Sequence, residues 1–162
     1  MDAPSPSLPA SCLKVQEAAE RLGLALAIRI MTEPTRTAEE AAAACGTTVA
    51  QIVKSLVFEG ATSGASYLLL VSGKNRVNEK GIAAILGEGL TRPGADRVRT
   101  LTGFAIGGIP PLGHATPLKT YIDEDLLAFD EVWAAAGTPF SIFAVSPKAL
   151  AEALKAPAIR VA

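Results

Sequence analysis

The sequence predicts one α+β domain with a mixed, mostly antiparallel β-sheet and surrounding helices. The chain of 162 residues has the usual size of a single domain, and its 49% hydrophobic and 19% charged residues are ordinary for a globular protein. Segments with helical and strand patterns are interspersed, but they do not alternate as regular βαβ units, which argues against a doubly wound parallel sheet. No internal repeat or linker divides the chain, so we expect one domain over residues 11–162.

The N-terminal segment over residues 1–10 is rich in proline and serine. It has little to bury, so we expect a disordered arm. It also lacks the basic and apolar regions of a secretory signal peptide.

The first half of the chain carries both helix and strand signals. Ser11 can cap a helix over residues 11–22 that Gly23 ends, and Thr37 begins the capping box Thr-Ala-Glu-Glu of a helix ending at Gly46. Between and after these helices we expect strands over residues 24–31, 52–59 and 66–72. The last of these contains the unbroken apolar run YLLLV, which is typical of a buried strand.

The second half continues with short elements. Asn78 can cap a helix over residues 79–86, and Gly103 ends a short helix over residues 96–101. Pro147 takes the first position of a final helix through residue 154. The remaining predicted elements are strands over 119–123, 131–135 and 140–145, a helical turn over 124–128 and an edge strand over 158–161.

Charge and cysteine content limit the function classes. The formal net charge is −1, which argues against a protein that binds nucleic acid over a wide surface, so any RNA contact must be local or weak. The two cysteines, Cys12 and Cys45, lie far apart in sequence, which indicates reduced thiols in a cytoplasmic protein. The longest apolar run, residues 68–71, is too short to span a bilayer, so we expect no membrane association.

Several catalytic classes lack their motifs. His114 is the only histidine, which excludes a metal site built on several histidines, and the cysteines form no cluster. The chain has no G-x-S-x-G elbow and no phosphate loop. Residues 103–108, GFAIGG, do not match the dinucleotide fingerprint. We therefore expect neither a metal nor a cofactor.

Two features remain as candidates for chemistry. Lys54 lies in the apolar segment IVKSLVF, where it either points to solvent or lines a cleft. The loop from Gly107 to His114, GGIPPLGH, has three glycines and two prolines in eight residues. Such a loop can present backbone N–H groups to a carbonyl or phosphate, or it can be a rigid surface turn. The residues alone leave both alternatives open.

The order of motifs resembles the YbaK/ProX family, the free-standing relatives of the editing insertion domain of bacterial prolyl-tRNA synthetases. The resemblance extends from Thr37 to Leu154. Its motifs are TAEEAAAACGTTVAQIVKSLVF, LLLVSGKNRVNEKGIAAILG, LTGFAIGGIPPLGH, YIDEDLL and AAGTPFSIFAVSPKAL. The resemblance implies a barrel-like core surrounded by helices.

The resemblance also implies site residues. The family's essential pocket lysine corresponds to Lys54, and the glycine-rich loop would offer the backbone of Gly107 and Gly108 to the aminoacyl ester. The implied substrate-binding residues are Ile109, Pro110, Pro111, His114 and Ser141. For His114 a structural bond to nearby backbone is the favoured alternative. The hydroxyls of Ser141, Thr138 and Ser55 can lie in the pocket or, equally, can be plain structure. Lys74, Asn75 and Arg76 can meet phosphates or form a charged β-turn.

The implied activity is removal of a wrong, small amino acid from tRNA, with tRNA for proline as the expected substrate. The family's range covers Ala, Ser, Thr, Cys and 2-aminobutyrate. Mischarged tRNA is the expected partner, with a prolyl-tRNA synthetase or an elongation factor as possible helpers, and DNA is not expected. Two alternatives remain: a non-catalytic module that binds tRNA or a synthetase, and a hydrolase of small esters or amides outside translation.

Overall fold

The computed structural model describes residues 8–162. The predicted arm therefore lies outside the described residues as far as residue 7, and its last residue begins the first helix, α1 (Ala10–Arg21). The prediction that Ser11 caps this helix was wrong. Pro9 stands at the N-cap with φ −53° and no side-chain cap bond forms, because the helix already includes Ser11 in its first turn.

In the part of the chain that the structure describes, eight strands form two sheets. The five-stranded sheet has the order β4-β2-β3-β5-β8, and the three-stranded sheet has the order β1-β7-β6. Four of the six pairings are antiparallel, and the β3–β5 and β5–β8 pairings are parallel, which confirms the predicted mixed, mostly antiparallel sheet. The strands are β1 (Arg29–Ile30), β2 (Val53–Gly60), β3 (Ser66–Ser72), β4 (Leu90–Thr91), β5 (Lys119–Asp123), β6 (Val132–Ala135), β7 (Ser141–Val145) and β8 (Ala158–Ile159).

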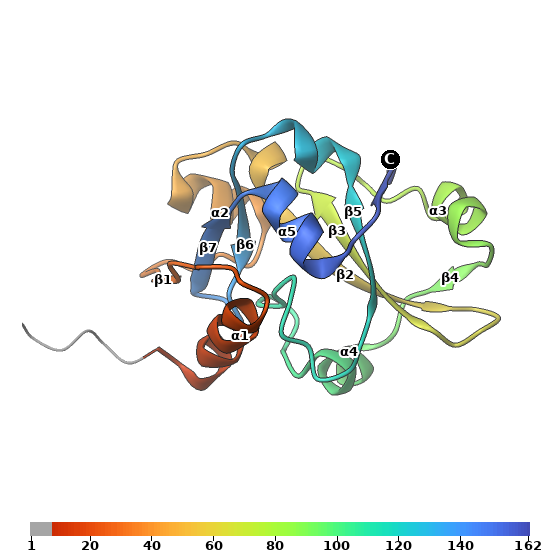
Figure 1. Ribbon diagram of the computed structural model, residues 1–162, viewed down its shortest axis with the longest axis horizontal. Helices are drawn as coiled ribbons and strands as arrows, with labels where there is room; N and C mark the ends of the chain where they lie inside the picture. The colour runs from red at the N-terminus through yellow and green to blue at the C-terminus, as the bar shows by residue number, and fades with distance from the viewer. Residues whose placement is uncertain (1–7) are drawn as a thin grey trace, which may run out of the picture.

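The helices surround these sheets, which curl into a half-barrel (Figure 1). Besides α1 they are α2 (Ala38–Cys45), α3 (Glu79–Leu86), α4 (Ala95–Thr102) and α5 (Pro147–Leu154), with the 3-10 turns η1 (Val49–Gln51) and η2 (Glu124–Ala128). The capping box of Thr37 and Glu40 is formed, and Gly46 ends α2 in the left-handed conformation at φ 68°. Within residues 8–162 no helix combines the length and the apolar character needed to cross a membrane.

Two short strands differ from the sequence prediction. Of the strand expected over residues 24–31, only Arg29 and Ile30 pair, with β7. Leu24, Leu26 and Ile28 still pack on the core at every second position, so the apolar alternation is real. Among residues 8–162, however, no strand pairs with this segment. The two-residue strand β4, which the sequence did not predict, pairs with the end of β2.

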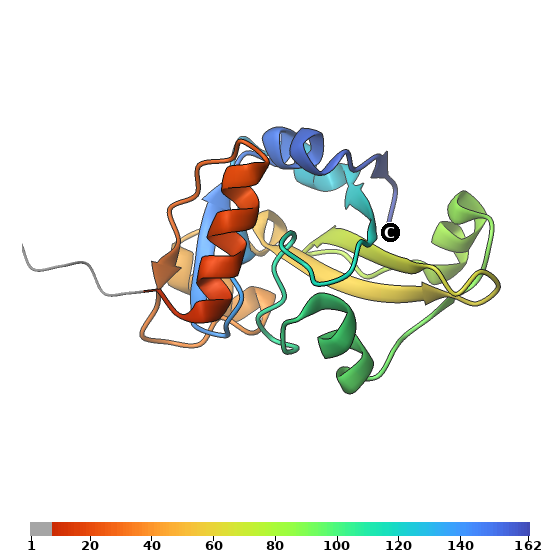
Figure 2. The ribbon, with the colours of Figure 1, turned by 60° about the horizontal axis from the view of Figure 1, so that its bottom comes forward.

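The core lies on both faces of β3. Leu68 and Leu70 belong to the main cluster, whereas Leu69 and Val71 belong to a second cluster on the opposite face, and all four are fully buried. This two-sided burial explains the unbroken apolar run. Figure 2 shows α1 lying across the three-stranded sheet, where Val15 contributes to the main cluster.

Candidate functional site

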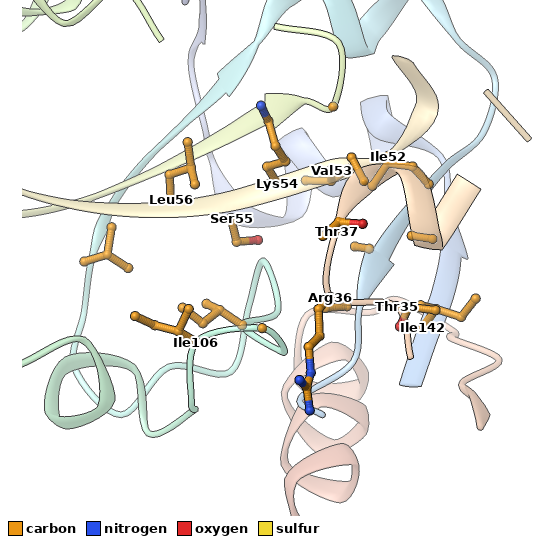
Figure 3. A pocket seen from close by; sticks show the side chains of 18 of the residues that line it. Thr35, Arg36, Thr37, Ile52, Val53, Lys54, Ser55, Leu56, Ile106 and Ile142 are labelled. Atoms are coloured by element: carbon orange, nitrogen blue, oxygen red, sulfur yellow. The ribbon is translucent and has the colours of Figure 1, made fainter. Parts of the chain in front are cut away.

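A cavity of about 580 Å³ lies beside β2, between the two sheets. This volume is within the range of about 300–1,000 Å³ that is usual for small-molecule sites. Its walls come from β2, β6, α4, the loop that contains Ile106 and Gly107, and the residues that lead into α2 (Figure 3). Its charged lining residues are Arg36, Glu39, Lys54 and Arg92, and its aliphatic ones include Val53, Val57, Val98, Ile109 and Ala134.

The cavity lies where β2 has an open edge. One edge of β2 pairs with β3 from Val53 to Glu59. On the other edge β4 covers only Glu59 and Gly60, and β6 reaches only Ile52, through a single bridge to Trp133. Within residues 8–162 no strand pairs with the middle of β2 on this side. The two sheets therefore separate along this stretch, and the cavity occupies the space.

Lys54 is half-buried at the rim of this cavity. Its Nζ donates to the backbone carbonyl of Asn75 at 2.5 Å. The Asn75 side chain donates in turn to one carboxylate oxygen of Asp123 and one of Asp125, at 2.8 Å each. The turn after β3 thus holds the ammonium group in place.

The surroundings also change the acidity of Lys54. Burial lowers the pKa of its ammonium group, Arg76 lowers it further, and Glu39 and Asp123 act in the opposite direction. Figure 3 shows the Lys54 and Ser55 side chains on opposite sides of β2, as strand alternation requires. Lys54 therefore places a cation at the rim, on the side of β2 opposite to Ser55, whose side chain faces the interior of the cavity.

The glycine-rich loop reaches the cavity through Gly107 and Ile109. Gly107 has φ 101°, and a Cβ built on it would lie 3.5 Å from Cγ of Arg36, so the Arg36 side chain packs against this glycine. The Gly108 N–H donates to the Ala105 carbonyl at 3.2 Å. Of the two loop amides implied as ester contacts, that of Gly108 is thus already bonded within the loop.

The other implied substrate-binding residues are not among those that line the cavity. Pro110 and Pro111 are buried, and the His114 ring nitrogen Nε2 donates to the Pro110 carbonyl at 2.8 Å. Burial lowers the pKa of His114, and that carbonyl opposes the effect. Ser141 is fully buried, and its hydroxyl bonds to the Thr138 hydroxyl at 2.8 Å. These contacts hold the loop and the turn before β7 in shape.

Of the polar residues that line the cavity, Arg36 was not predicted from the sequence, and Ser55 was predicted only as one of three hydroxyls that could lie in the pocket. Arg36 is exposed at the mouth, and the hydroxyl of Ser55 is a buried group that finds no hydrogen-bond partner among the described residues. The alternation of β2 could have separated Ser55 from Lys54, but only the fold brings Arg36 to the same cavity. Among the described residues, no three His, Cys, Asp or Glu side chains gather as a metal site would require.

The chain is similar to known proteins over most of its length. Residues 32–153 match the family described as “Aminoacyl-tRNA editing domain”. The uncharacterized protein YwhH of Bacillus subtilis (strain 168) is 32% identical over 117 residues, which cover 72% of this chain and 73% of YwhH.

Solved structures agree with this relationship. The crystal structure of “a putative trans-editing enzyme for prolyl tRNA synthetase” is 49% identical with a TM-score of 0.90, covering 96% of this chain and 98% of that one. The hypothetical protein APE2540 is 32% identical with a TM-score of 0.85, covering 91% of this chain and 98% of that one. A match over this much of the chain, in both sequence and fold, establishes the family: the chain belongs to the aminoacyl-tRNA editing domain family.

Proposed function

We propose that the protein is a trans-acting deacylase that hydrolyses the ester between a wrong, small amino acid and the 3′ end of tRNA in the cytoplasm. The observation that carries the proposal is the position of Lys54: a hydrogen bond to the Asn75 carbonyl fixes its ammonium group at the rim of a mostly aliphatic cavity. The family supports it, as does the relative named as a trans-editing enzyme for prolyl tRNA synthetase, from which we take tRNA for proline as the substrate.

The reaction needs few catalytic groups. Water adds to the ester carbonyl, and the bond between the carbonyl carbon and the ribose oxygen breaks. One proton of the water passes to the ribose oxygen and the other to solvent, so the amino acid leaves as a carboxylate. The ester is already activated, so a placed water and a stabilised oxyanion suffice. Lys54 would bind the carbonyl oxygen or the terminal phosphate, and Gly107 and Ile109 would form part of the wall around the aminoacyl group.

The aliphatic walls favour a small, neutral side chain. Val53, Val57, Val98 and Ala134 offer no charged group to the interior of the cavity. Ala, Ser, Thr, Cys and 2-aminobutyrate are the candidates. Size alone discriminates by only about 1–3 kcal/mol per methylene. We therefore expect the enzyme to hydrolyse more than one of these substrates when they differ by a single methylene.

The tRNA itself would be held by few contacts. The net charge is −1, and Arg36 at the mouth can meet a phosphate of the 3′ end. A prolyl-tRNA synthetase or an elongation factor would then supply the remaining affinity.

The test is a panel of tRNAs for proline charged with each candidate amino acid, with free aminoacyl esters of the same amino acids beside them. Release of the amino acid from one or more tRNAs, faster than from the free esters, supports the proposal. Binding without release would mean a non-catalytic module. Equal rates on tRNA and free esters would mean a small-ester hydrolase.

A further inference from the structure

The open edge of β2 presents peptide groups to the cavity in a definite order. The Gly60 N–H donates to the Ala65 carbonyl, and the Gly73 N–H donates to the Ile52 carbonyl. Even-numbered residues of β2 thus direct their peptide groups toward β3. In an antiparallel pair the direction alternates from residue to residue, so Ser55 and Val57 direct their N–H and C=O groups to the opposite edge.

This opposite edge faces the cavity. β4 covers it only from Glu59 onward, and the bridge to β6 lies at Ile52, so Ser55 is in the uncovered stretch between the two. Both Ser55 and its neighbour Lys54 line the cavity. Buried backbone N–H and C=O groups are almost always paired in folded proteins, so an open edge inside a cavity calls for a partner.

An aminoacyl group has the right chemistry to be that partner. Its amino group donates and its ester carbonyl accepts, at the same spacing as the N–H and C=O of one residue in a strand. It can therefore exchange two hydrogen bonds with a single edge residue, as the two residues of a hydrogen-bonded antiparallel pair do. The amino group would donate to the Ser55 carbonyl, and the Ser55 N–H would donate to the ester carbonyl.

The side-chain arrangement agrees with this pairing. Residues directly opposite each other in an antiparallel pair have their side chains on the same face, with Cβ atoms about 4.5–5.5 Å apart. The side chain of the bound amino acid would then lie beside that of Ser55, whose hydroxyl has no hydrogen-bond partner within residues 8–162 and is turned to the interior (Figure 3). A hydroxyl on the β-carbon of the substrate would be within its reach.

We propose that Ser55 is a substrate-binding residue that pairs with the aminoacyl group as one added residue of the sheet, and that its hydroxyl favours substrates with a hydroxyl on the β-carbon. The inference rests on the proposed function. The Ser55 N–H donates to the oxygen that becomes negative during hydrolysis, so this amide takes the oxyanion role for which the Gly108 amide is not free.

The first experiment observes the amides directly. The probe is 3′-serylamino-3′-deoxyadenosine, whose amide bond resists hydrolysis, added to the ¹⁵N-labelled full chain. We expect a changed chemical shift and slower hydrogen exchange for the Ser55 amide, with smaller changes for the amides of Lys54 and Leu56, which face β3. A probe that leaves the Ser55 amide unchanged, whether it binds at Gly107 or does not bind at all, overturns the inference.

The second experiment measures selectivity between seryl- and 2-aminobutyryl-tRNA, whose side chains differ only by OH against CH₃. The Ser55→Ala change should lower the ratio of kcat/KM for seryl- over 2-aminobutyryl-tRNA by about two- to tenfold, the effect of one lost hydrogen bond. The control is Ser66→Ala at the other end of the hairpin, which should leave the ratio unchanged. An unchanged ratio in Ser55→Ala overturns the role of the hydroxyl.

These outcomes separate the inference from the proposed function. Deacylation by the unaltered protein tests the proposed function alone. An active enzyme whose Ser55 amide does not respond to the probe would refute only the pairing of the aminoacyl group with β2. An inactive protein whose Ser55 amide responds to the probe would refute only the deacylase.

Discussion

Gly108 packs directly against the backbone of Thr138: a Cβ built on Gly108 would lie 2.7 Å from the Thr138 carbonyl carbon. Real Cβ atoms do not come this close to backbone, so one of the two segments would have to move. The glycine therefore joins the glycine-rich loop to the turn before β7. This contact explains the glycine at position 108 by packing, without a contact to substrate.

We expect Gly108→Ala to destabilise the protein by about 1–3 kcal/mol, the usual cost of overpacking. If the Gly108 backbone instead bound the ester, as the family resemblance implies, the same change would lower activity with at most a modest shift in stability. Thermal melts and deacylation rates of the folded protein measure both effects. Gly89→Ala is the matched control, since its Cβ would meet only the Ala61 methyl at 3.7 Å. A melting temperature unchanged from that of the control would contradict this account of the loop.

The Lys54→Met change should abolish most deacylation while the fold remains intact. It keeps a long side chain but removes the cation at the rim, and the loss of one such stabilising group costs on the order of 10²–10³ in rate. Single-turnover deacylation and a thermal melt on the same sample provide the measurement. Lys148→Met on the exposed part of α5 serves as the control for the loss of one charge. Near-normal rates in folded Lys54→Met would remove this residue from the mechanism.

Asn75 is expected to act as a positioning residue for Lys54. Asn75→Ala removes the hydrogen bonds to Asp123 and Asp125, so the turn whose carbonyl accepts from Lys54 loses its anchor. Stability should fall by about 1–3 kcal/mol, because Asp123 is buried and loses one donor.

A double-mutant cycle separates positioning from simple destabilisation. If Asn75 acts through Lys54, the double variant Asn75→Ala/Lys54→Met should deacylate no more slowly than Lys54→Met alone. Additive losses in kcat would show that Asn75 affects the site by another route.

Glu88 should make the free energy of unfolding depend on pH in the acidic range. Its carboxylate accepts from the Ser63 amide at 2.9 Å, from the Tyr67 hydroxyl at 2.6 Å and from the Ser63 hydroxyl at 2.7 Å. These bonds lower the pKa of Glu88 from 4.5 to about 2. The unfolded chain therefore binds the proton first as the pH falls, so the contribution of Glu88 is present above pH 4.5 and is lost between pH 4.5 and about 2.

Urea unfolding from pH 6 to pH 2 measures this contribution. Glu88→Gln should be less stable than the unaltered protein at pH 6, and the two should converge as the pH approaches 2. Parallel curves over this range would mean that Glu88 is not the titrating group. The same hydrogen bond raises the pKa of Tyr67, so its ultraviolet titration should begin at lower pH in the Glu88→Gln variant.

Much of the fold could be predicted because its signals are local. The capping box at Thr37, the glycine at position 46 and the strand over residues 66–72 each depend on residues within one turn or one strand. By contrast, residues 24–28 have the apolar alternation of a strand but pair with no strand in the described part of the chain. The two-residue strand β4 exists only because the end of β2 is beside it. Strand pairing depends on the partner, which local sequence does not contain.

The candidate site divides in the same way. Residue types and motif order determined the family and selected Lys54 and the glycine-rich loop, since both are readable within a few positions. The tertiary structure alone decided that β2 keeps an open edge and that Gly108 supports the loop while Gly107 reaches the cavity. It also decided that Arg36 packs against Gly107 at the mouth of the cavity. The physical reason is that a cavity forms where two sheets separate. That separation depends on which distant segments fail to pair, and no short stretch of sequence records it.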